Sequence, residues 1–267
     1  MRFRLERRNV IGTALLAAAA QQRQPAVAEQ FGSLSGYAPR VEGIGGGADV
    51  LSEAPSILDV AFPPSLIGLW QCERCVVSCE GDASQAAGAW FDLGGRSAAL
   101  FTSREPEIFL TRFVASPSGA ETDGGVATVL DRSFEVSNRI SNAINVTWDV
   151  TSPNTLLFER GDGSGGGLGP TELTVVQRKV ELPSDKGFGF DELIRVSSRA
   201  GGLFGNQQLI RAARVKRRYR RAYDENGERV VEGLEVMKTY RVLDGVAGVE
   251  LPTSTTKSTL RLTRPRT

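Results

Sequence analysis

The chain has 267 residues, 40% of them hydrophobic, which is enough for one well-buried domain with appendages and excludes disorder throughout. It contains no histidine, so the most common general base and the most common nitrogen ligand for metals are both missing. The net charge is +1, which argues against a dedicated nucleic-acid-binding protein, because such proteins carry a strong basic excess.

The first 28 residues carry the three zones of an export signal. Arginines dominate the start, residues 10–20 are apolar, and Ala26-Val27-Ala28 places small residues where a signal peptidase cleaves. The apolar run is shorter than the ~20 residues that span a bilayer. Arg7 and Arg8, directly before this run, resemble a twin-arginine signal. We expect cleavage after Ala28 and no transmembrane segment in the mature chain; an amphipathic or buried helix is the alternative.

Residues 29–60 are rich in Gly, Ser and Ala, and they predict a flexible lead with room for one short helix at 48–54. The glycine run at 43–49 lacks the Lys-Ser/Thr of a phosphate-binding loop, and no strand precedes it. We therefore assign this segment no nucleotide site.

Residues 61–267 predict a mainly β domain. Short β-like segments follow one another with turn residues between them, and they do not alternate with long helical runs. This pattern favours an antiparallel barrel of the lipocalin or calycin type. Residues 132–144 have an ambiguous periodicity that also allows a short helix. The predicted strands are 67–78, 97–102, 107–115, 126–131, 143–149, 155–160, 171–182, 189–198, 208–223, 229–243 and 257–264.

The strands at 208–223 and 229–243 form the clearest hairpin, through a turn that contains Asn-Gly. Strand alternation puts Arg217, Tyr219, Arg221 and Tyr223 on one face. Arginines beside tyrosines are unusual in a dry core and would suit a barrel interior that holds a polar or anionic ligand. A solvated face, partly neutralised by glutamates of the return strand, is the alternative, and the basic run could also bind an acidic partner or anionic lipid headgroups.

Cys72, Cys75 and Cys79 are the three cysteines of the chain. A structural zinc site takes four Cys or His ligands, so three cysteines without histidine predict no metal. Strand alternation puts Cys72 and Cys75 on opposite faces, and puts Cys75 and Cys79 on one face ~13 Å apart, too far for a disulfide. Small core residues are the favoured interpretation, and a redox-switchable thiol pair stays open.

Gly68-Leu69-Trp70 opens the first strong strand and resembles the Gly-x-Trp that begins lipocalin-like barrels. In that fold the indole closes one end of the barrel and stacks under an arginine from the last strand. The resemblance implies that Gly68 and Trp70 are structural residues, with Arg261 or Arg264 as the stacking partner.

A second resemblance covers about residues 60–264. The segments "FPPSLIGLWQCERCVVSCEGDA", "VLDRSFEVSN", "VTWDVTSPNTLLF" and the Arg/Tyr-rich hairpin resemble a family of uncharacterised photosynthetic proteins. This is domain of unknown function family 6816, found in cyanobacteria, algae and plant chloroplasts. The resemblance implies a chloroplast or cyanobacterial thylakoid-lumen location, with the bacterial periplasm as the alternative. It brings no established activity and no catalytic residues.

No nucleophile–base pair, carboxylate motif or nucleotide fingerprint stands out, so we expect a protein without catalytic activity or cofactor. The first hypothesis is a barrel that binds a small apolar or amphipathic molecule such as a pigment, quinone or lipid. The second is an auxiliary or assembly factor that docks on a photosynthetic membrane complex through its charged hairpin. An enzyme with an unrecognised acid/base pair is less favoured.

Overall fold

The computed structural model describes residues 58–119, 121–122, 124–140, 142–161, 168–185, 187–200, 207–240 and 251–265. The predicted signal at 1–28 and nearly all of the lead at 29–60 lie outside these residues, so both stay predictions.

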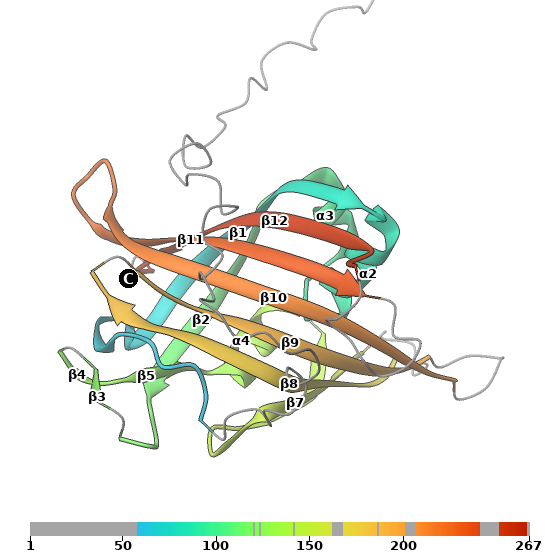
Figure 1. Ribbon diagram of the computed structural model, residues 1–267, viewed down its shortest axis with the longest axis horizontal. Coiled ribbons are helices and arrows are strands. Elements are labelled where there is room, and N and C mark those ends of the chain that lie inside the picture. Colours follow the sequence, from blue (N-terminus) through green and yellow to red (C-terminus); the bar gives the residue numbers. More distant parts are fainter. Residues whose placement is uncertain are drawn as a thin grey trace, which may run out of the picture. The chain divides into compact units, whose positions relative to one another are not determined.

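Within the described residues, ten strands form one antiparallel sheet that curls into a half-barrel (Figure 1). They are β1 (Gly68–Gly81), β2 (Glu107–Ala115), β5 (Thr128–Leu130), β6 (Ala143–Asp149), β7 (Ser152–Arg160), β8 (Leu168–Ser184), β9 (Gly187–Ala200), β10 (Gln207–Tyr223), β11 (Arg229–Tyr240) and β12 (Ser254–Thr263). Their order is β5-β2-β1-β12-β11-β10-β9-β8-β7-β6. The predicted mainly β, calycin-like fold is confirmed. A separate small hairpin pairs β3 (Glu121–Thr122) with β4 (Gly125–Val126).

Two short helices, α2 (Ala83–Asp92) and α3 (Ala98–Ser103), follow β1. The predicted strand at 97–102 is wrong, because this segment is helical. Ser97 caps α3 by accepting a hydrogen bond from the Ala99 N–H at 3.1 Å, and the alanines that follow favour a helix. The helix α2 was not among the predicted elements, although Asp82 caps it by accepting from two backbone N–H groups at 3.0 Å.

The helix α4 (Arg132–Arg139) connects the two edges of the half-barrel. It lies in the chain between the edge strands β5 and β6, and it contacts both β2 and β6. Asp131 caps it by accepting from the Phe134 N–H at 2.9 Å, and the same carboxylate forms an ion pair of 2.6 Å with Arg112 on β2. Residues 132–139 are therefore helical, which is one of the two structures that the sequence allowed for this segment. The helix bridges the open side of the curled sheet, between β2 and β6.

Aromatic rings fill part of the concave side. Phe62, which precedes the short 3-10 helix η2 (Pro64–Leu66), packs edge-on against Phe113 with ring centroids 5.1 Å apart. Its ring also lies edge-on to Phe188 and Tyr219, at 6.0 and 6.2 Å, and these two rings stack on each other at 5.4 Å. The segment before β1 therefore contributes directly to the core of the half-barrel.

Candidate functional site

Trp70 is buried at one end of the half-barrel. Its indole N–H donates to the Leu66 carbonyl at 2.6 Å, and the guanidinium of Arg264 stacks over its ring, 4.0 Å from the centroid. Arg264 also donates to the carbonyls of Ile67 and Leu69, at 2.9 and 3.0 Å. These contacts hold the beginning of β1 against the end of β12.

Gly68 and Arg261 have different surroundings. Gly68 has a φ of 99°, and a Cβ there would lie 3.2 Å from a guanidinium nitrogen of Arg264, so two constraints favour glycine. Arg261 is exposed, with Glu73 and Glu232 beside it in register on the neighbouring strands. Of the two arginines left open by the sequence, Arg264 is the one that stacks on Trp70.

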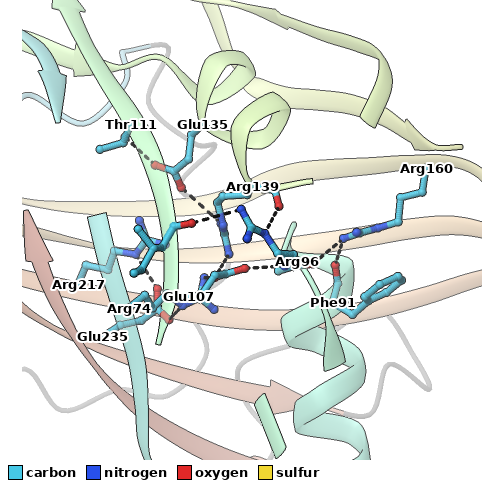
Figure 2. Close-up of polar contacts among 12 residues, drawn as sticks. Arg74, Phe91, Arg96, Glu107, Thr111, Glu135, Arg139, Arg160, Arg217 and Glu235 are labelled. Atoms are coloured by element: carbon cyan, nitrogen blue, oxygen red, sulfur yellow. Dashed lines mark hydrogen bonds and ion pairs between the residues drawn. The ribbon is translucent and has the colours of Figure 1, made fainter. Parts of the chain in front are cut away.

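A network of buried charges lies inside the half-barrel (Figure 2). The closest ion pairs are Arg217–Glu235 at 2.7 Å and Arg74–Glu235 at 3.2 Å. From the helix α4, Arg139 reaches two further glutamates, at 3.3 and 3.4 Å. The charges of the network balance: its arginines are Arg74, Arg139 and Arg217, and its glutamates are Glu107, Glu135 and Glu235.

The pKa values indicate that this network is ionic. Burial lowers the pKa of Arg74 to about 10, and its guanidinium also stacks on Trp90 at 3.3 Å. Burial alone would raise the pKa of Glu235, but Arg74 and Arg217 outweigh it and lower this pKa to about 2. The carboxylate of Glu235 is therefore charged at neutral pH, and it compensates two buried guanidinium groups.

A second buried cluster joins four elements of the chain. Arg132 donates to Glu192 at 2.8 Å and to Asp59 at 2.7 Å, while Arg178 donates to Glu192 at 2.7 Å. Arg132 and Arg178 outweigh the effect of burial and lower the pKa of Glu192 to about 2. This cluster anchors the segment before β1 to β8, β9 and the start of α4.

Both clusters contribute to the wall of a cavity of about 90 Å³. Pockets for drug-sized molecules measure roughly 300–1,000 Å³. At about 90 Å³, this cavity is smaller than such pockets. Its charged lining residues are Arg74, Arg132, Arg139, Arg217, Glu135, Glu192 and Glu235.

A much larger space lies at the Trp70 end, outside the charged interior. This groove measures about 1070 Å³ and is formed by η2, the paired ends of β10 and β11, and the end of β12. Leu66, Trp70 and Val231 give it a buried apolar floor, while Tyr223 is 70% exposed at its side. We call it the Trp70 groove. Its lining residues are Pro64, Ser65, Leu66, Trp70, Gly124, Arg221, Ala222, Tyr223, Glu228, Arg229, Val230, Val231, Thr263, Arg264 and Pro265.

The four residues singled out on the hairpin lie in two environments. Tyr219 is buried in the core, where burial raises the pKa of its hydroxyl, and Arg217 belongs to the charge network. Arg221 and Tyr223 line the Trp70 groove. One face of β10 therefore extends from the interior, at Arg217 and Tyr219, to the rim of the half-barrel, at Arg221 and Tyr223.

Sequence reasoning missed most of the charge network. Arg74 has the strand parity of Trp70 and Cys72, both buried, and Glu107 has the parity of the buried Phe109. In each strand, a charged residue stands at a position where the alternation of buried and exposed residues predicts an apolar one. This pattern was the signal that could have identified Arg74 and Glu107.

The cysteines are free thiols in three settings. Burial raises the pKa of Cys72 to about 12, while the Cys75 thiol donates to the Arg104 carbonyl at 3.2 Å. The expectation that Cys75 and Cys79 share a face is wrong, because a register shift between Val76 and Ser78 reverses the alternation. Cys79 packs against the core and accepts from the Thr256 hydroxyl at 3.8 Å.

In the described ranges, no three Cys, Asp or Glu side chains gather in a way that could hold a metal ion. Nor does any described helix have the length and apolar character needed to cross a membrane.

Comparison with known proteins gave one match. The model of a family described as Domain of unknown function (DUF6816) matches residues 55–266, a range that includes the whole sheet and its helices. None of the curated proteins and none of the solved structures compared matches the chain.

Proposed function

The chain belongs to the DUF6816 family, a domain of unknown function, and we propose that it is a non-catalytic protein that binds a small amphipathic molecule in the Trp70 groove. The carrying observation is the groove itself, which combines an apolar floor, an exposed aromatic ring and charged side chains at its rim. A pigment, a quinone or a lipid has the matching chemistry, with an apolar body and a polar end.

Size supports the groove over the interior. At about 1070 Å³ the groove has space for such a molecule, whereas the interior cavity measures about 90 Å³ and has seven charged residues in its wall. Tyr223 supports the same conclusion, because a large aromatic side chain that is 70% exposed leaves its ring free to cover a ligand.

A docking role on a photosynthetic membrane complex is the second proposal, and it has less support. Three arginines on the convex face of β10 are already paired, Arg214 with Asp191, Arg218 with Glu181 and Arg220 with Glu232, at 2.6 to 2.9 Å. Pairing reduces the basic field that such docking would use.

We propose the thylakoid lumen of a chloroplast or cyanobacterium as the location, with the bacterial periplasm as the alternative. This proposal rests on the twin-arginine-like start of the sequence and on the resemblance described above. Edman sequencing of the protein isolated from lumenal fractions tests it, and the expected first residue is Glu29.

The binding proposal is tested by native mass spectrometry of the protein purified from its own cells without detergent or delipidation. We expect an adduct with the mass of a small amphiphile. Tyr223→Ser should reduce its occupancy, whereas Leu182→Ser, which replaces an equally exposed residue (70%) outside the groove, should not. Adduct-free protein that also takes up no amphiphile in titrations would show the proposal to be wrong.

A further inference from the structure

Two arginines stand out on the concave face of the hairpin. In the register of β10 and β11, Arg221 lies opposite Val231 and Tyr223 lies opposite Arg229. Directly opposed residues share a face, and so do residues two apart along a strand, so these four side chains continue the face of Arg217 and Tyr219. All four line the Trp70 groove.

Arg221 and Arg229 differ from the other arginines of this hairpin in their partners. Arg214, Arg217 and Arg220 each form an ion pair with a carboxylate, at 2.6 to 2.7 Å. Neither Arg221 nor Arg229 forms an ion pair or a side-chain hydrogen bond with any residue that the structure describes. Both belong to the exposed class of residues, so their guanidinium groups remain available to an incoming anion.

The rest of the groove does not neutralise them. Arg264 adds a third positive charge, although its donors are engaged with the carbonyls of Ser65, Ile67 and Leu69. Among the described lining residues, Glu228 is the one carboxylate. The groove therefore carries a net positive charge beside its apolar floor.

The spacing suits one shared anion. Diagonal neighbours across an antiparallel pair lie ~7–8 Å apart, which describes Arg221 and Arg229 in this register. Two flexible side chains at that separation can converge on a single carboxylate or phosphate, and guanidinium groups match the geometry of both. The ring of Tyr223 and the buried Val231 lie next to the two guanidinium groups. They can therefore contact the first part of the apolar chain that is attached to the charged head.

We propose that Arg221 and Arg229 bind the carboxylate or phosphate head of an anionic amphiphile, whose apolar part lies along Tyr223, Leu66 and Val231 in the Trp70 groove. This inference rests on the proposed function and names the chemical class of its ligand. The same head chemistry occurs in a free fatty acid and in the headgroup of an anionic lipid within a bilayer.

The test compares laurate with its neutral glycerol ester, monolaurin, by calorimetric titration into the full-length protein below the micellar concentrations. Laurate should bind at least about tenfold more tightly, since hydrogen bonds to charged groups are worth that much. Arg221→Gln/Arg229→Gln should abolish this preference by weakening laurate binding to the level of monolaurin binding. The control is Lys216→Gln/Arg261→Gln, which removes the same charge from exposed positions outside the groove and should keep the preference.

A second arm identifies the source of the head group. Flotation with phosphatidylcholine vesicles, with and without phosphatidate, should show phosphatidate-dependent binding that the Arg221→Gln/Arg229→Gln variant loses if the ligand is a bilayer lipid. Laurate selectivity without flotation assigns the site to a free amphiphile. Equal binding of laurate and monolaurin, with no charge dependence in either arm, overturns this inference but leaves the proposed function standing. Binding of neither compound refutes both.

Discussion

Glu235 is the residue on which the interior charges depend most directly, because it pairs with both Arg74 and Arg217 at 3.2 and 2.7 Å. Glu235→Ala leaves two buried guanidinium groups with too few carboxylates, and it should cost ~3–5 kcal/mol of unfolding free energy. Glu232→Ala is the control, since Glu232 pairs with the more exposed Arg220, and its cost should stay under ~1 kcal/mol. Urea unfolding followed by tryptophan fluorescence measures both; equal costs would contradict the assigned role of the buried pairs.

At the Trp70 end, Arg264 and Arg261 give a matched pair on one strand. Arg264→Ala removes the stack on Trp70 and hydrogen bonds to backbone carbonyls, and it should cost ~1–3 kcal/mol. Arg261→Ala removes an exposed side chain and should change the unfolding free energy by less than ~0.5 kcal/mol. Urea titrations of both variants measure these changes in unfolding free energy. A larger loss for Arg261→Ala would show that the stack contributes little.

At the scale of elements, α4 should determine how firmly the two edges of the sheet are held. Asp131 both caps this helix and pairs with Arg112 on β2, so Asp131→Ala should cost ~1–2 kcal/mol. Amide hydrogen exchange should accelerate in α4 and in β6. Asp82→Ala removes the comparable cap of α2, and its effect should stay within that helix. Unchanged exchange in β6 after Asp131→Ala would mean that α4 does not hold that edge.

Elements with a strong local pattern could be predicted from the sequence. Each of the ten strands of the sheet overlaps a predicted strand, and Asn-Gly located the turn of the long hairpin. The prediction of a strand at 97–102 is wrong, because six residues are too few to distinguish a helical from an extended pattern. Tertiary contacts determine the structure of this segment: the ring of Phe101 packs on that of Trp90, with centroids 5.6 Å apart. The bulge in β1 could not be foreseen either, since it depends on register with β12.

The candidate site, too, could be predicted from the sequence only in part. The shared face of Arg217, Tyr219, Arg221 and Tyr223 follows from alternation within one strand. The partners of these residues do not, because the charge network draws on β1, β2, α4, β10 and β11, which only the sheet order brings together. Whether a residue on that face lies in the interior or at the rim depends on where the half-barrel ends. The local sequence does not determine where it ends.

For the whole molecule, the buried carboxylates predict the response to acid. The pKa of Glu192 and of Glu235 falls from 4.5 to about 2 on folding, so their contribution is complete above pH 4.5 and is lost as the pH falls toward 2. The melting temperature should therefore drop across that window. With no histidine in the chain, no imidazole titrates between ~pH 5 and 8, and stability there should be nearly constant.

The check is differential scanning calorimetry of the wild type and of Glu235→Gln across this pH range. The variant should be less stable at pH 7 and should lose less of its remaining stability on acidification, since one of the responsible carboxylates is gone. A parallel decline of both proteins would assign the acid response to other groups.

The pairing of β1 with β12 has a kinetic consequence. Cys72 lies opposite Leu262, so the first strand of the sheet pairs with β12, which follows it by more than 170 residues in the sequence. During synthesis the hairpins from β8 to β11 can form as they emerge, but β1 and β11 cannot be joined until β12 has been synthesised. Closing that long loop is the slow entropic step, and until then β1 and β11 each expose an unpaired edge to which another chain can add.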